Sequence, residues 1–155
     1  MHVKICSREE LESLMRRGLH ESTAVISFYE MGAAPANIPG IRNEVFKVEL
    51  DTSDLSHETY FPEAEILAHF VFIARNAGLK IICQCETGQT FSAGCAAAIR
   101  QYFNADGIAV FTNHHYSPDL LMYHRVYSAL ILESVAQEEC FYGGAQSAYC
   151  NQLSA

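Results

Sequence analysis

Four short stretches of the chain have the apolar, β-branched composition of strands, and segments with helical periodicity separate them. These stretches are residues 2–6, 23–29, 44–50 and 79–84. The third, "EVFKVEL", alternates apolar and polar residues as a strand does. The fourth, "LKIICQ", has a continuous apolar character, which is typical of a central strand in a sheet.

The segments between these strands carry the start and stop signals of helices. Ser7 is a predicted N-cap with Glu10 in the capping-box position, and Gly18 follows as a stop. A second helix is expected to take Pro62 into its first turn and to close at Gly78. Further helices are predicted over residues 92 to about 104 and 118 to about 137, with a short turn or helix near 106–112.

Strands that alternate with helices predict an α/β sandwich around a mostly parallel sheet. We expect four or five mostly parallel strands with helices on both faces. A chain of 155 residues is long enough for one hydrophobic core, so a single domain is predicted over residues 1–137. Residues 138–155 form a C-terminal tail that contains a glycine pair and has no clear assignment.

Composition and charge indicate which partners and which cellular compartment to expect for the chain. The net charge is −8, and the ten Lys and Arg residues are spread out, so neither nucleic acid nor an anionic membrane is an expected partner. The run of apolar residues that a membrane span needs is missing. The polar start of the chain and six irregularly spaced cysteines favour a cytoplasmic protein with reduced thiols.

One cysteine stands at a position where the chain predicts reactive chemistry. The central strand runs directly into "CETGQTFSAGCAAAI", a glycine-containing turn followed by a helix of small residues. In this geometry backbone N–H groups converge near the positive end of a helix, where they bind anions and lower the pKa of a thiol. Cys85 is therefore a candidate nucleophile, Gly88 allows the turn, and Ser92 is placed to hydrogen-bond the sulfur or cap the helix.

This string resembles the signature loop of the cysteine-dependent tyrosine and dual-specificity phosphatases, in which His-Cys is followed by five residues, Arg, and Ser or Thr. The likeness spans about residues 22–133, where "YFPEAEILAHFVFIARNAG" and "YSPDLLMYHRVYSAL" look like helices of that family. It implies the phosphatase fold, a catalytic Cys85, and Asp51 at the position of the general acid. It also implies a phosphate-binding loop made of Glu86, Thr87, Gly88, Gln89, Thr90, Phe91 and Ser92.

Three positions depart from the pattern of the family. The loop arginine of the family clamps phosphate in a bidentate way and stabilises the developing charge, and Phe91 can do neither. Gln84 replaces the histidine, and Asp119 stands where the late helix offers Asn. Electrostatic groups of this kind contribute about 10²- to 10⁵-fold in rate in acyl- and phosphoryl-transfer enzymes.

Two functions are therefore predicted. The first is a catalytically degenerate, phosphatase-like protein whose pocket, closed by Phe91 as an apolar plug, binds an anionic or phosphorylated ligand or a partner. A phosphorylated small molecule or a phosphoprotein is the expected ligand. The alternative is an active phosphatase or other thiol hydrolase, in which Cys85 attacks, loop amides hold the oxyanion and Asp51 protonates the leaving group. Arg100 or Arg125 would then replace the missing cation.

Several acid–base candidates lie in one loop, but turn formation alone can explain the composition of this loop. Asp51 and Asp54 lie in "DTSDLSH", which is rich in turn-forming and capping residues. His57 and Glu58 are spare candidates in the same loop.

A metal site is disfavoured by the spacing of its candidate ligands. Cys83 and Cys95 are expected in the core. Together with Cys85 and His114 or His115 they match no standard zinc pattern, so we predict neither a metal nor another cofactor.

Overall fold

The computed structural model describes residues 1–18, 22–39, 44–53 and 60–152, with side chains as far as Phe141. Within these residues, four parallel strands form one sheet: β1 (Val3–Ser7), β2 (Thr23–Glu30), β3 (Glu44–Leu50) and β4 (Lys80–Cys85). Their order is β1-β4-β2-β3. The apolar strand β4 thus lies between two neighbours, which confirms its predicted central place.

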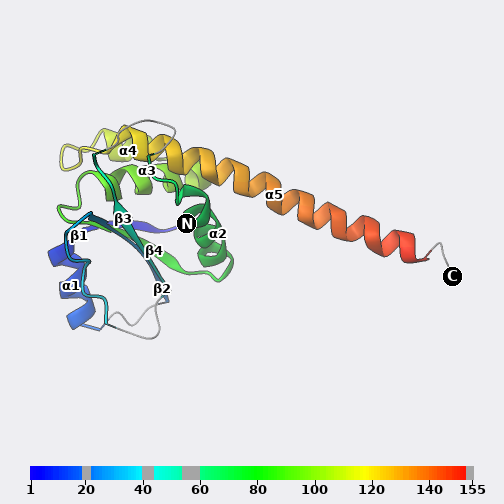
Figure 1. Ribbon diagram of the computed structural model, residues 1–155, viewed down its shortest axis with the longest axis horizontal. Coiled ribbons are helices and arrows are strands. Elements are labelled where there is room, and N and C mark those ends of the chain that lie inside the picture. Colours follow the sequence, from blue (N-terminus) through cyan, green and yellow to red (C-terminus); the bar gives the residue numbers. More distant parts are fainter. Residues whose placement is uncertain (19–21, 40–43, 54–59, 153–155) are drawn as a thin grey trace.

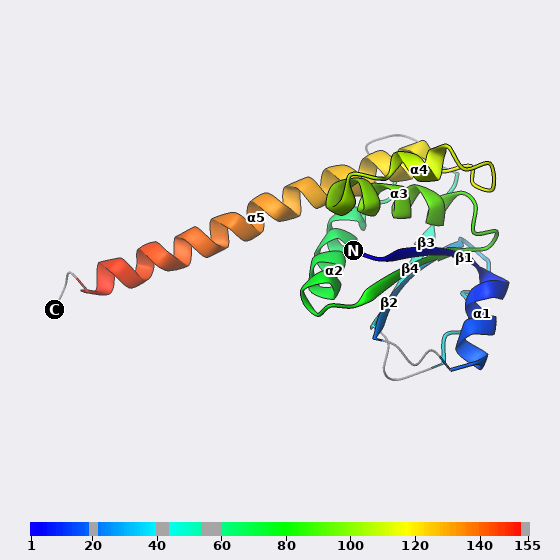
Figure 2. The ribbon, with the colours of Figure 1, turned by 180° about the vertical axis from the view of Figure 1, so that it is seen from behind.

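Helices cover both faces of this sheet, as predicted (Figure 1). α1 (Arg8–Arg16) lies on one face. On the other face, α2 (Ala64–Asn76) and α3 (Phe91–Asn104) contact the strands, and α5 (Leu120–Gln152) packs across both of them (Figure 2). The short α4 (Ile108–Phe111) connects α3 to α5. None of the helices in the described part of the chain combines the length and apolar character needed to cross a bilayer.

The alternation of side chains along the strands divides the core between the two faces. On β2, Ile26 and Phe28 belong to the large cluster beneath α2, α3 and α5, whereas Val25 packs with Leu11 of α1. Cys85, at the end of β4, belongs to the large cluster. Its side chain therefore lies on the face that α3 covers.

The predicted helix signals are nearly all found in place. The hydroxyl of Ser7 accepts from the backbone N–H of Glu10 at 3.1 Å, and the Glu10 carboxylate accepts from the Ser7 N–H at 2.8 Å, which completes the capping box. Gly18 and Gly78 have the positive φ angles of helix-terminating glycines, 78° and 69°. Pro62 lies just before the first turn of α2 and not inside it.

The end of α5 was predicted wrongly. The sequence placed it near Gln137 and left residues 138–155 unassigned, whereas the helix continues to Gln152 and projects from the domain (Figure 1). A glycine pair costs a helix about 1 kcal/mol per residue, which weakens it without stopping it. Of the α5 side chains that the structure describes, Leu130 is the last fully buried one.

Candidate functional site at Cys85

Cys85 is the last residue of β4, and the next helix begins only six residues later at Phe91. The predicted order of strand, turn and helix is therefore present. Cys85 is 2 % exposed as a residue, and it lies at the carboxyl end of a central parallel strand, where α/β proteins place their ligand sites.

Gly88 packs the loop against the end of β1. Its φ of +69° lies in the left-handed region, and a Cβ there would lie 2.5 Å from the Ser7 nitrogen and 2.8 Å from the Cys6 carbonyl carbon. The backbone N–H of Arg8 donates to the Glu86 carbonyl at 3.2 Å. Only glycine fits this position without moving one of the two backbones.

The segment before α5 holds the other side of the loop. The Ser117 N–H donates to the Gln89 carbonyl at 2.9 Å, and the Asp119 N–H donates to the Thr90 carbonyl at 3.2 Å. The Asp119 carboxylate accepts from the Met122 N–H at 2.6 Å, as an N-cap does. Asp119, a departure from the family pattern, therefore caps α5 and supports the loop through its backbone.

The thiol of Cys85 is held among hydrogen-bond donors. Its Sγ lies 3.0 Å from the Ser92 Oγ. Burial raises the pKa of Cys85, but hydrogen bonds from the Ser92 hydroxyl and from the backbone N–H groups of Ser92, Thr90 and Gly88 outweigh it and lower the pKa below its ordinary value. The loop amides thus converge on the sulfur, and the thiolate forms at a lower pH than in an ordinary cysteine.

The neighbouring buried thiols have the opposite character. Cys83 and Cys95 are fully buried, as predicted, with their sulfurs 3.9 Å apart. The hydrogen bond to Cys95 and then burial raise the pKa of Cys83, and burial raises the pKa of Cys6 to about 11. Groups of three or more His, Cys, Asp or Glu able to hold a metal are not found among the described residues.

Gln84, which stands where the family has histidine, is buried behind the loop. Its Oε1 accepts from the Ser27 hydroxyl at 2.6 Å, and the residue is 2 % exposed. This neutral pair joins β4 to β2, so Gln84 takes a structural place in the sheet.

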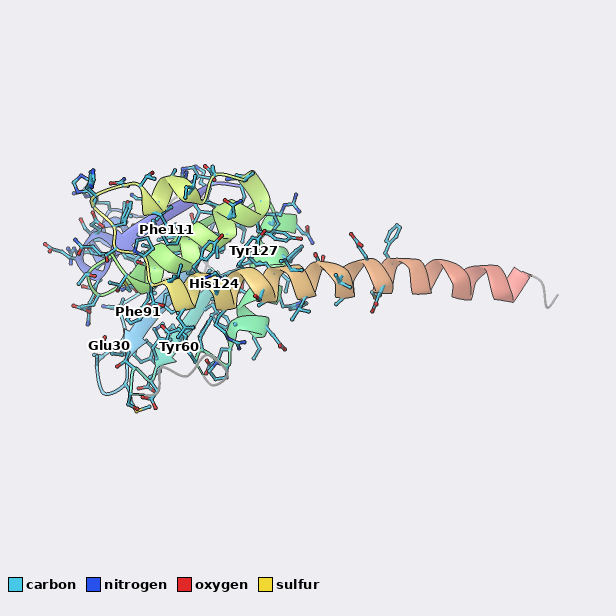
Figure 3. The ribbon with its side chains drawn as sticks, turned by 90° about the horizontal axis from the view of Figure 1, so that it is seen from above. Glu30, Tyr60, Phe91, Phe111, His124 and Tyr127 are labelled. Carbon is cyan, nitrogen blue, oxygen red and sulfur yellow. The ribbon has the colours of Figure 1, made fainter. Side chains whose placement is uncertain are left out.

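A pocket of about 250 Å³, here called the thiol pocket, opens at Cys85. Its lining consists of Phe28, Tyr29, Glu30, Ala33, Cys85, Glu86, Thr87, Thr90 and Phe91. The half-buried Phe91 is one of its walls, and Figure 3 shows Phe91 and Glu30 at the same end of the molecule. Two of the lining residues are carboxylates, and none of them is Lys or Arg in the part of the chain that the structure describes.

The two arginines that the sequence offered as replacement cations are engaged elsewhere. The Arg100 guanidinium forms an ion pair with Asp106 at 2.6 Å. Arg125 donates to the carbonyls of Tyr60 and Phe61 at 3.0 and 3.3 Å. Neither arginine lines the thiol pocket.

Arg8 is a cation near the loop that the sequence analysis missed. Its Nη1 lies 3.5 Å from a Glu86 carboxylate oxygen and donates to the Ala34 carbonyl at 3.0 Å, while its Nε pairs with Glu12 at 3.2 Å. The only signal in the sequence was its place directly after β1, whose last residue pairs with Cys85 in the sheet. Arg8 is not one of the residues that line the thiol pocket.

Asp51 lies apart from the thiol pocket in this structure. Its carboxylate accepts from the Ser53 N–H at 2.9 Å and from the Ser53 hydroxyl at 2.5 Å, as in a tight turn. It lines a different pocket, beyond the end of β3. Asp54, His57 and Glu58 lie outside the described residues. A role for Asp51 as general acid therefore stays a prediction.

Comparisons with known proteins agree with this geometry. No protein-family model and no curated protein matches the chain. Solved structures do: PTPMT1 in complex with PI(5)P has a TM-score of 0.60 and 12 % identity over 88 % of this chain and 94 % of that one. Human DUSP28 matches with a TM-score of 0.53 and 13 % identity over 86 % of this chain and 94 % of that one.

A third match is the human tyrosine phosphatase-like serine/threonine/tyrosine-interacting protein, with a TM-score of 0.51 and 16 % identity over 81 % of this chain and 87 % of that one. The chain therefore has the fold of the tyrosine and dual-specificity phosphatases, as the loop motif predicted. At these identities the likeness establishes the fold, and the function has to be argued from the site.

Proposed function

We propose that this protein is a catalytically degenerate, phosphatase-like protein that uses the thiol pocket to bind a partner without efficient turnover of phosphate esters. The observation that carries the proposal is the charge of the pocket lining. Glu30 and Glu86 line it, and Phe91 stands where a phosphatase has its arginine.

The electrostatic consequence for a phosphate group is large. Loss of a cation that stabilises a transferring phosphoryl group costs about 10³- to 10⁵-fold in rate. Two unit charges 4 Å apart interact by about 1 kcal/mol in water and by about 4 kcal/mol near a protein surface, so carboxylates in the lining add repulsion to that loss. The loop amides that hydrogen-bond Cys85 remain in place, so the loss concerns the cation.

Of the two kinds of ligand suggested by the sequence, this lining favours a partner over an anionic or phosphorylated molecule. The name of one matching structure describes a phosphatase-like interacting protein, which supports partner binding as a use of this fold.

Hydrolysis of para-nitrophenyl phosphate tests the proposal. We expect wild type and Cys85→Ser to be equally inactive under reducing conditions, and Phe91→Arg to gain turnover that the double variant Phe91→Arg with Cys85→Ser loses. The double variant controls for hydrolysis that does not use the thiol. Wild-type turnover that disappears in Cys85→Ser would contradict the proposal.

A working thiol hydrolase is the second candidate, and the state of Cys85 favours it. Hydrogen bonds lower the pKa of the thiol, and the Ser92 hydroxyl lies 3.0 Å from the sulfur. Such a thiolate can attack an uncharged ester without a phosphate clamp. Cleavage of para-nitrophenyl acetate that depends on Cys85, with phosphate esters untouched, would favour this candidate.

A further inference from the structure

The lining of the thiol pocket combines aromatic residues with two glutamates, and this combination suits a cation. We propose that it binds a single basic side chain, a lysine ammonium or an arginine guanidinium, presented by a protein partner. The proposal rests on the proposed function, because it names what the pocket binds in place of phosphate.

The size and walls of the pocket fit one side chain. Its volume of about 250 Å³ lies below the range of about 300–1,000 Å³ that drug-sized ligands occupy. Three of the lining residues are aromatic: Phe28, which is buried in the core, and Tyr29 and Phe91, which are half-buried. A cation over an aromatic face gains about 0.5–2 kcal/mol, more as it loses water, and guanidinium gives up its water more readily than ammonium does.

The carboxylates of the lining are available to such a cation. Within the described part of the chain, the Glu30 side chain takes part in no hydrogen bond or ion pair. The Glu86 side chain is 74 % exposed, and the cation beside it, Arg8, is 3.5 Å away and shared with Glu12. Arg8 is thus shared between the carboxylates of Glu12 and Glu86, and Glu30 adds a further negative charge to the lining.

The net charge of the whole chain also favours a basic partner. A formal net charge of −8 attracts basic partners and repels phosphorylated ones over distances up to the Debye length of about 8–10 Å. A partner surface with an exposed Lys or Arg would meet a complementary field before it reaches the pocket.

Protection of Cys85 from alkylation tests this inference on the full-length protein. The rate of modification by the neutral reagent iodoacetamide is measured at Cys85 by mass spectrometry, which separates it from the other cysteines. Three probes are compared: a short glycine–arginine peptide, the same peptide with citrulline for arginine, and inorganic phosphate. Citrulline keeps the shape of arginine and removes its charge.

We expect the arginine peptide to slow alkylation of Cys85, and the citrulline peptide and phosphate to leave it unchanged. Glu30→Gln should weaken the protection by about two- to fivefold, since an exposed ion pair contributes up to about that factor. Glu49→Gln is the matched control, because Glu49 is an exposed glutamate of the adjacent strand that lines the other pocket. It should leave the protection unchanged.

The inference is overturned if phosphate protects, if the citrulline peptide protects as well as the arginine peptide, or if none of the probes protects. Its failure is distinct from that of the proposed function. Turnover of phosphate esters would refute the proposed function, whereas equal protection by the two peptides, or protection by none of the probes, without turnover would refute the cation site alone.

Discussion

Replacement of Gly88 by alanine measures how tightly the cysteine loop is built into the sheet. Gly88 has a φ of +69°, and the added Cβ would lie 2.5 Å from the Ser7 nitrogen and 2.8 Å from the Cys6 carbonyl carbon. Both neighbours are backbone atoms at the end of β1, so neither can turn aside as a flexible side chain would.

Two costs add at this position. A residue with a Cβ in the left-handed region lowers the stability of the fold by about 1–2 kcal/mol. Overpacking against atoms that cannot move away costs about 1–3 kcal/mol more. Gly88→Ala should therefore lower the free energy of unfolding by about 2–5 kcal/mol, a large share of the about 5–15 kcal/mol of a typical domain.

Gly32→Ala is the matched control, because Gly32 has a φ of +83° and no atom within 4 Å of an added Cβ. The free energy of unfolding of Gly32→Ala should fall only by the cost of the left-handed backbone conformation, about 1–2 kcal/mol. Urea unfolding followed by circular dichroism gives both values. Equal losses in the two variants would refute the close packing of the loop on β1, and with it the physical reason for glycine in the turn.

Two further predictions concern the thiol and the late helix. Ser92→Ala removes a hydrogen bond that lowers the pKa of Cys85, so the pH profile of Cys85 alkylation should shift to higher pH. An unchanged midpoint of this profile would show that the hydroxyl does not stabilise the thiolate. Leu130→Ala should lower the free energy of unfolding by about 2–5 kcal/mol because Leu130 is fully buried. Leu132→Ala on the same helix should change it by less than about 0.5 kcal/mol, because Leu132 is 60 % exposed, and comparable losses in a urea titration would contradict the packing of α5.

Features with a local cause were predicted well from the sequence. Ser7 and Glu10 cap α1 through contacts within four residues of the chain, and the apolar run of β4 indicated a central strand. Cys85 and Gly88 were found because one strand and one turn position them. The end of α5 was missed because a glycine pair weakens an exposed helix without supplying a stop signal.

The charge of the thiol pocket had no such local signal. Glu30 reaches it from the end of β2, and Arg8 approaches the loop from the start of α1. Each lies more than fifty residues from Cys85 in the chain, and only the order of the strands brings them to one edge of the sheet. The sequence could show that a cation was missing at Phe91, but it could not show that carboxylates line the same space.

The most direct test of the central claim is a titration of the ¹⁵N-labelled protein with inorganic phosphate, followed at the backbone amides of Gly88, Thr90 and Ser92. These are the amides that hydrogen-bond the sulfur of Cys85 and that a bound phosphate would have to contact. We expect no saturable shift of these signals in wild type and a saturable shift in Phe91→Arg. A saturable shift in wild type would show that the pocket still holds phosphate, and would contradict the claim that its chemistry has been lost.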